Sequence, residues 1–202
     1  MVVRRLARVS TDTEQDSPRQ YRPELGQQQR RTRRPLWCDQ NMTFLEARSL
    51  DEPERPALVA MLAQEHAAGW LVDQLRRRSP SFDDFAVWSD GAPVGALRGN
   101  TRTSFAGNNA FDEFELPRGP HAFLSGIFIA TQARGTDAAA LLVRSFVLAA
   151  EERGATFIAG TMDRSFDGGV RRGFFEKCGF VITLSQQFGA PTDDLLGTLS
   201  SL

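Results

Sequence analysis

From residue 42 onward, apolar and polar residues follow the periods of regular secondary structure. Residues 42–48 alternate with period two, which predicts a strand. Residues 56–68 carry apolar side chains at helical spacing, and residues 71–75 continue a second short helix. Three arginines follow at 76–78, where positive charge complements the C-terminal end of a helix dipole. This part of the chain therefore predicts a strand followed by two helices.

The middle of the chain predicts a hairpin, a long loop and a buried strand. Residues 85–97 contain two short apolar segments around an Asp-Gly turn, and this dipeptide supplies the positive φ angles of a tight turn. Residues 100–119 show no period, and a loop of this length in a compact domain is commonly functional. Residues 122–130 form a nearly continuous apolar run, as expected of a strand buried on both faces.

The second half predicts alternating helices and strands. A helix with one wide apolar arc covers 136–153 and ends before a glycine. A short strand at 156–159 and a helix at 168–177 follow, then strands at 180–184 and 195–202. The predicted order is β-α-α-β-β-β-α-β-α-β-β. It describes an α/β fold with a mixed sheet of about seven strands and about four flanking helices.

Residues 1–41 follow neither period and are rich in Arg and Gln. We expect a disordered tail here, before a single domain over 42–202. Four arginines between residues 30 and 34 could contact nucleic acid or an acidic surface. A solvated tail is the preferred interpretation, because nearby acids dilute the positive charge. Translation from Met42 is an alternative, since that residue opens the first predicted strand.

Composition and charge exclude several classes of protein. The 202 residues are 41% hydrophobic and 24% charged, which excludes a collagen-like or fully disordered chain. The sequence contains no run of about 18 apolar residues, so we expect no membrane span. Cys38 and Cys178 form no Cys-x-x-Cys motif, so we expect no metal site and a reducing, cytoplasmic location. The net charge of −1 divides into +4 for residues 1–41 and −5 for residues 42–202.

The most informative segment is the strand, turn and helix over residues 127–142. The turn contains Arg134 and Gly135, and the first amides of the following helix have no intrahelical partner. Such a turn presents N–H donors to a phosphate, although an ordinary strand-to-helix connection has the same pattern. Residues 174–180, Phe-Phe-Glu-Lys-Cys-Gly-Phe, end a later helix. Together, in this order, the two segments resemble the GNAT superfamily of N-acetyltransferases over residues 42–190.

The family pattern is R-G-x-G-x-[GA] after a strand, then a helix, a strand and a helix ending near F-Y-E-K-x-G-F. The resemblance implies a sheet splayed open between its fourth and fifth strands, with acetyl-CoA as co-substrate and no metal. Pantetheine would pair with the fourth strand at Ile127 and Ile129. The pyrophosphate would lie on turn and helix residues Arg134, Gly135, Asp137, Ala138 and Ala139.

The implied function is acetyl-CoA-dependent N-acetylation of a primary amine, on a small molecule or a peptide, by direct transfer. We expect a monomer or a homodimer without membrane or nucleic-acid partners. Three positions depart from the family: Asp137 replaces a Gly, Phe175 a Tyr, and Gly168 an Asn. Because the family Tyr is usually assigned to protonate the leaving thiolate, a catalytically impaired CoA-binding or scaffolding module is the alternative.

Few residues are candidates for proton transfer and acceptor binding. The family often places a Glu on the fourth strand, at positions that map to Phe123 and Ser125, and Ser125 could relay a proton only through water. His121 opens this strand and has a suitable reference pKa for a base, with a structural role as its alternative. Candidates for binding a cationic amine, with a solvated surface as the alternative, are Glu65, His66, Asp112 and Glu113.

Overall fold

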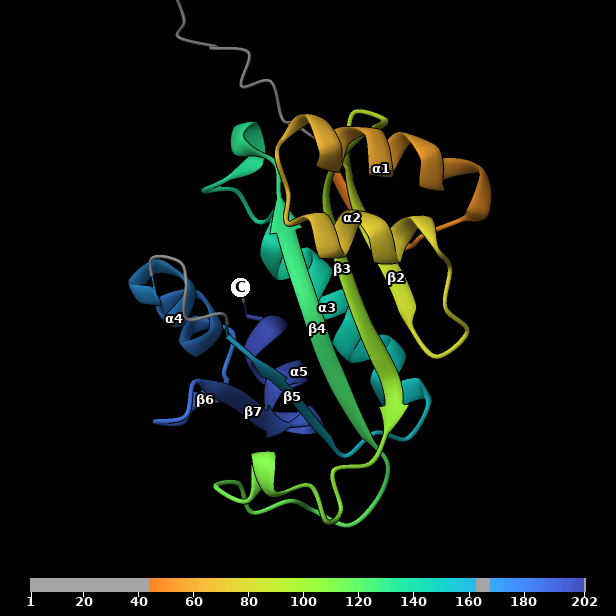
Figure 1. Cartoon of the computed structure of the whole chain (residues 1–202). Helices are drawn as coiled ribbons and strands as arrows, with labels where there is room; N and C mark the ends of the chain where they lie inside the picture. Colours follow the sequence, from red (N-terminus) through yellow and green to blue (C-terminus); the bar gives the residue numbers. More distant parts are fainter. Residues whose placement is uncertain (1–43, 163–167, 202) are drawn as a thin grey trace, which may run out of the picture. The chain divides into compact units, whose positions relative to one another are not determined.

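The computed structural model describes residues 44–162 and 168–201, so the predicted tail and the alternative start at Met42 lie outside the described residues. Seven strands form one mixed sheet in the order β1-β2-β3-β4-β5-β7-β6 (Figure 1). They are β1 (Leu45–Ser49), β2 (Asp83–Ser89), β3 (Ala92–Thr103), β4 (His121–Ile129), β5 (Phe157–Thr161), β6 (Val181–Ile182) and β7 (Gln187–Pro191). Among the described strands only β4 and β5 pair in parallel, while every other neighbouring pair is antiparallel.

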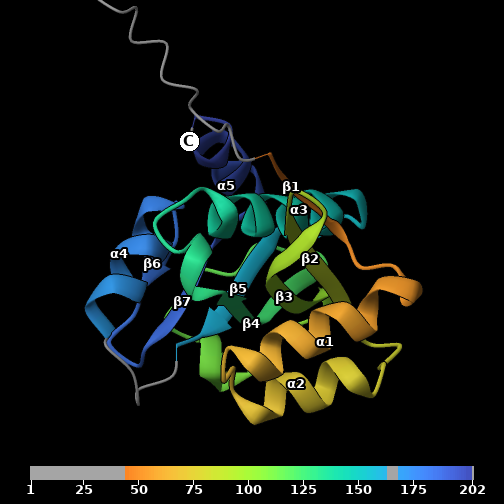
Figure 2. The same cartoon turned by 90° about the horizontal axis from the view of Figure 1, so that it is seen from above.

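Helices cover both faces of the sheet. They are α1 (Arg55–Gln64), α2 (Gly69–Arg76), α3 (Ala138–Glu152), α4 (Gly168–Lys177) and α5 (Thr192–Leu199). Helices α1 and α2 lie on one face, with α3 on the other (Figure 2). The larger hydrophobic cluster joins α3, α4 and α5 to the sheet, and a second cluster joins α1 and α2 to β2 and β3. None of the described helices combines the length and the apolar character needed to cross a membrane.

The predicted α/β fold is confirmed, with the expected number of strands. Residues Asp90 and Gly91 form the predicted turn between β2 and β3, with φ angles of 49° and 80°. The long run at 122–130 forms β4, and the helix expected over 136–153 forms α3. The structure has five α-helices among its described residues, where about four were expected.

Two predicted elements are wrong in detail. The helix expected over 56–68 ends at Gln64, because His66 adopts a left-handed backbone with φ of 54°. The strand expected at 195–202 is instead helix α5, and the last strand of the chain is β7. Helix α5 begins directly after Pro191, which fixes φ and lacks an N–H, and its first turn carries two acids.

Candidate functional site

Strands β4 and β5 separate halfway along β4. Their parallel pairing ends with Leu124 opposite Gly160, whereas β4 continues to Ile129 paired only with β3. The register between β3 and β4 shifts at the same point: Arg98 is opposite Gly126, but Gly99 is opposite Leu124. Ser125 is therefore the extra residue of a β-bulge, and a bulge bends its strand. The predicted splay between the fourth and fifth strands is thus present, and among the described residues one edge of β4 has no partner strand from 125 to 129.

The unpaired edge of β4 leads directly into a turn rich in free amides. Gly135 has φ of 81°, a left-handed conformation that glycine adopts readily, and nothing lies within 4 Å of where its Cβ would be. The Thr136 hydroxyl accepts a hydrogen bond from the Ala138 amide at 3.3 Å. Within the described ranges, the backbone N–H groups of four residues donate no hydrogen bond: Gly135, Asp137, Ala139 and Ala140.

Two charged side chains lie exposed at this turn. Arg134 Nε donates to the carbonyl oxygen of Ile129 at 3.3 Å, which places the guanidinium beside the end of β4. Asp137 is the residue before α3, and its carboxylate makes no capping hydrogen bond. A guanidinium attracts a pyrophosphate, whereas a carboxylate at the same turn opposes it.

Glu65 is committed to a contact that sequence reasoning did not predict. Its Oε2 accepts hydrogen bonds from the backbone N–H of Thr131 at 2.9 Å and from the Thr131 hydroxyl at 2.8 Å. These hydrogen bonds lower the pKa of the Glu65 carboxyl. The contact joins the end of α1 to the end of β4. The neighbouring His66 is exposed in the turn between α1 and α2.

His121, the predicted base, has partners at both ring nitrogens. Nδ1 accepts from the Phe105 amide at 2.9 Å, so Nε2 carries the proton and donates to the Pro117 carbonyl at 2.9 Å. The ring is 3% exposed and stacks on Phe105. It also lies four residues, about 13 Å along the strand, from the bulge at Ser125. This geometry gives His121 the structural role of fastening the 104–120 loop, and we do not propose it as the base.

Asp112 and Glu113, the two candidate acids of the long loop, lie near the end of β4 that begins at His121. Glu113 accepts a hydrogen bond from the Ser185 hydroxyl, which links the long loop to the turn before β7. Asp112 is exposed after a short 3-10 turn at 109–111. The structure therefore does not gather the four candidate acceptor residues in one place, because Glu65 and His66 lie near the opposite end of β4.

An aromatic stack lines the end of β5. The ring of Phe175 stacks on Phe188 with centroids 4.1 Å apart, and a Cβ at Gly160 would clash with the Phe188 ring. Phe175 is therefore close to the splay, although it offers no proton. The nearby Cys178 is also buried, and burial raises the pKa of its thiol to about 11.

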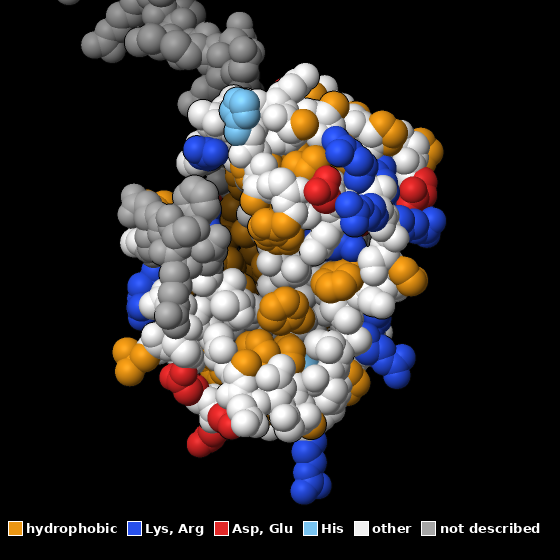
Figure 3. All heavy atoms as spheres, in the orientation of Figure 1, with side chains coloured by type: hydrophobic (Ala, Val, Ile, Leu, Met, Phe, Trp, Pro, Cys, Tyr) orange, Lys and Arg blue, Asp and Glu red, His pale blue; other side chains and the backbone are white. Residues whose placement is uncertain are grey.

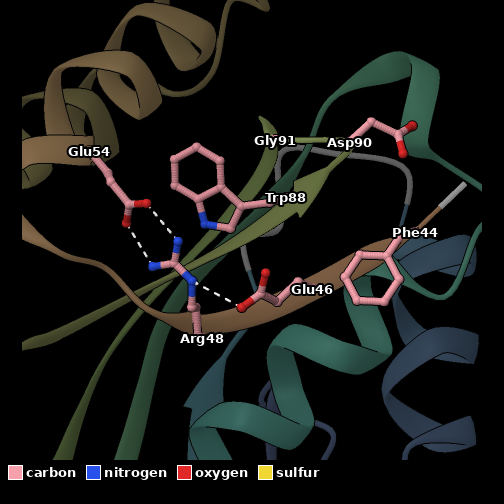
Figure 4. A pocket seen from close by; sticks show the side chains of 7 residues that line it. All are labelled: Phe44, Glu46, Arg48, Glu54, Trp88, Asp90 and Gly91. Atoms are coloured by element: carbon pink, nitrogen blue, oxygen red, sulfur yellow. Dashed lines mark hydrogen bonds and ion pairs between the residues drawn. The ribbon is translucent and has the colours of Figure 1, made fainter.

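A shallow hollow lies elsewhere, between β1 and β2 (Figure 4). Its volume of about 130 Å³ is below the range of roughly 300–1,000 Å³ that takes small-molecule ligands. The Arg48 guanidinium is already paired with Glu54 at 2.6 Å and Glu46 at 3.2 Å, and it lies over the Trp88 ring. We therefore assign this hollow no ligand. Among the described residues, no group of three or more His, Cys, Asp or Glu could hold a metal.

Sequence reasoning missed two features of the site. The bulge at Ser125 depends on the register with β3, which no local pattern reveals. Trp70 of α2 lies against Gly126, the residue after the bulge, yet it is 46% exposed. The one signal available for it was a large aromatic residue directly before the helix predicted over 71–75.

Solved structures of similar fold include several acetyltransferases. An aminoglycoside N-acetyltransferase in complex with CoA matches at 16% identity and a TM-score of 0.56, covering 70% of this chain and 90% of that one. The ribosomal-protein-S18-alanine N-acetyltransferase from Escherichia coli matches at 13% identity and 0.54, covering 74% and 94%. An aminoglycoside 6'-N-acetyltransferase from Acinetobacter baumannii matches at 18% identity and 0.53, covering 69% and 92%.

At these identities the likeness shows the fold alone. A search of curated proteins found no significant sequence match. The model of the acetyltransferase (GNAT) family matches residues 27–180, which is more than half of the chain and includes the splay and the turn at 134–140. The chain therefore belongs to the GNAT acetyltransferase family.

Proposed function

We propose that the protein is an acetyl-CoA-dependent N-acetyltransferase that acts on a primary amine of a small molecule or a peptide. One observation carries this proposal: the unpaired edge of β4 runs directly into a turn where four amides have no partner among the described residues. An extended amide-containing chain with a pyrophosphate at its end matches that arrangement. Two of the similar structures, both aminoglycoside N-acetyltransferases, were solved with CoA or a CoA-containing analogue.

The turn fits a pyrophosphate and β4 fits pantetheine. Free N–H groups at the start of α3 carry partial positive charge, and Gly135 leaves the approach to them open. Residues Arg134, Asp137, Ala138 and Ala139 would complete this site. The half-buried Ile127 and Ile129 would offer backbone groups to pantetheine along the free edge of the strand.

Bound acetyl-CoA would supply the activated acetyl group, and the protein must then move two protons. The hydroxyl of Ser125 lies at the bulge and has no hydrogen-bond partner in the part of the chain that the structure describes. It can pass the ammonium proton to a water chain. Phe175 cannot return a proton to the leaving thiolate, so water fills that role as well.

The second candidate is a CoA-binding module with impaired catalysis. Its support is the stack of Phe175 on Phe188, where the family has a Tyr in place of Phe175, together with the Asp137 carboxylate at the turn. It predicts CoA binding without acetyl transfer to any amine.

Two measurements on the full-length protein separate the candidates. The first is a thermal shift with CoA, where binding at 100 times Kd adds about 2.7 kcal/mol of stability. The second is thiol release from acetyl-CoA across a panel of primary amines. A shift with thiol release supports the enzyme, and a shift without release supports the module. No shift at millimolar CoA would contradict both.

A further inference from the structure

Trp70 covers the point where β4 bulges. Its indole lies directly on Gly126, so closely that a Cβ there would come within 2.5 Å of Trp70 Cη2. Gly126 follows Ser125 and belongs to the stretch of β4 that pairs with β3 but not with β5. Although this contact covers part of the ring, 46% of the residue remains exposed. A large aromatic surface is therefore presented to solvent beside the proposed reaction centre.

Helix α2, which carries Trp70, is anchored to the sheet by two arginines. Arg98 Nη1 donates to the carbonyl of Gln74 at 3.0 Å, and Arg55 Nη1 donates to the carbonyl of Leu75 at 2.9 Å. Both guanidiniums also bind the buried Asp84 carboxylate, at 2.9 Å and 2.7 Å respectively. These contacts tie the last turn of α2 to β2 and β3. Since Trp70 stands in the first turn of the same short helix, these contacts also hold its backbone beside β4.

The two faces of the splay have different surroundings. The proposed pyrophosphate turn begins α3, which lies on the sheet face opposite α1 and α2 (Figure 2). CoA would therefore lie toward the α3 face, and the amine would approach the acetyl group from the α1–α2 face. Trp70 lies on that second face, because Gly126 pairs with Arg98, whose side chain contacts α2.

A second aromatic residue on this face flanks the bulge. Phe123 is half-buried and meets Phe105 and Phe111 edge to face, with centroids 6.4 Å and 6.3 Å away. It points to the same side as Gly126, because its neighbour Leu124 packs into the core on the α3 side. Figure 3 shows hydrophobic side chains gathered over this stretch of β4, with the surface hollowed beside them.

Two of the carboxylates considered for binding a cationic acceptor, Glu65 and Glu113, already accept hydrogen bonds, whereas Asp112 stays exposed. Glu65 accepts two hydrogen bonds from Thr131, and Glu113 accepts one from Ser185. Building on the proposed function, we propose that Trp70 determines acceptor specificity, and that the acceptor is a primary amine carrying an aromatic ring or a similar apolar group. Stacking on the indole would orient that group and bring the amine toward the bulge.

The test compares two amines that differ by one ring, 3-phenylpropylamine and n-propylamine. Their kcat/KM with acetyl-CoA and their Kd by calorimetry, with and without CoA, are measured on the full-length protein. We expect the phenyl compound to bind about tenfold more tightly, the scale of a favourable aromatic pair together with the apolar area that it buries. Trp70→Ala should abolish this preference, while Trp70→Phe should keep most of it.

Two further variants make the test specific. Gly126→Ala keeps the tryptophan but displaces its ring, so it should reduce the preference as Trp70→Ala does. Phe44→Ala removes another exposed aromatic residue, at the β1 end of the molecule, and should leave the preference unchanged. Equal binding of both amines by the wild type, or an unchanged preference in folded Trp70→Ala, would overturn the assignment. Failure to bind CoA would refute the proposed function separately, since the amine titrations without CoA still decide the role of Trp70.

Discussion

Leu124 on β4 and Gly160 on β5 form the last residue pair that joins these two strands. Beyond this pair β4 bulges at Ser125 and the strands separate. A Cβ at Gly160 would lie 2.6 Å from the Leu124 carbonyl oxygen and would clash with the ring of Phe188. Because Gly160 has no side chain, the two strands can pair as far as the splay, and the Phe188 ring can pack over their junction.

Gly160→Ala should destabilise the fold through this clash. Overpacking a dense core costs about 1–3 kcal/mol, and both neighbours here, a backbone oxygen and a stacked ring, have little freedom to move. Urea unfolding monitored by circular dichroism measures the change. The control is Gly197→Ala in α5, where nothing lies within 4 Å of the new Cβ and helix propensity favours alanine by roughly 1 kcal/mol. Equal stability of the two variants would contradict the steric role of Gly160.

A glycine at each end of α3 provides a matched pair of variants that tests the proposed pyrophosphate-binding turn. Gly135 precedes the helix with φ of 81°, and Gly154 follows it with φ of 76°. Alanine at either position should cost about 1–2 kcal/mol of stability, because the left-handed conformation is strained for residues with a Cβ. Only Gly135→Ala should also weaken CoA binding, measured by calorimetry, since only that turn carries the proposed pyrophosphate donors. Equal CoA affinity in both variants would remove the turn from the site.

Glu65→Gln should change how stability depends on pH. Hydrogen bonds from Thr131 hold the pKa of Glu65 below its ordinary value of 4.5. The carboxylate therefore stabilises the fold above pH 4.5, and this contribution is lost as pH falls through the lowered pKa. The difference in unfolding free energy between wild type and variant should shrink below pH 4.5. Glu151→Gln, at an exposed position on α3, is the control, and the same shrinkage there would contradict the assignment.

Asp84→Asn should be among the most damaging single changes near the site. It leaves the guanidiniums of Arg55 and Arg98 facing a neutral amide, and the Arg98 side chain is only 1% exposed. Breaking a buried ion pair in this way costs about 3–5 kcal/mol. Asp83→Asn removes a more exposed ion pair with Arg153 and should cost less. If Asp84→Asn lowered the unfolding free energy less than Asp83→Asn does, the claim that Asp84, Arg55 and Arg98 anchor α2 to the sheet would be contradicted.

The sequence predicted those elements that local periodicity encodes strongly. The apolar run at 122–130 and the wide apolar arc of 136–153 correspond to β4 and α3. The turn at Arg134–Gly135 was recognisable because a left-handed glycine before a helix is a local feature. Strand β7 was not predicted, since Gln187–Pro191 is short and contains both Gly and Pro. Its burial depends on pairing with β5 and β6 rather than on its own pattern.

Side-chain roles within the site were harder to predict than the elements. His121 has the residue type of a general base, but its two hydrogen bonds to the 104–120 loop depend on tertiary contacts. Glu65 and Thr131 are far apart in the chain and meet only when α1 packs beside the end of β4. The position of Trp70 over Gly126 likewise requires both the bulge and the docking of α2.

Hydrogen exchange with and without CoA tests the central claim most directly. On the full-length protein saturated with CoA, we expect slower exchange of the four amides that lack partners among the described residues, Gly135, Asp137, Ala139 and Ala140. Amides along the free edge of β4, from 125 to 129, should also gain protection, while those of β1 should not change. Unchanged exchange at residues 135–140 in the CoA-saturated protein would contradict the proposed site.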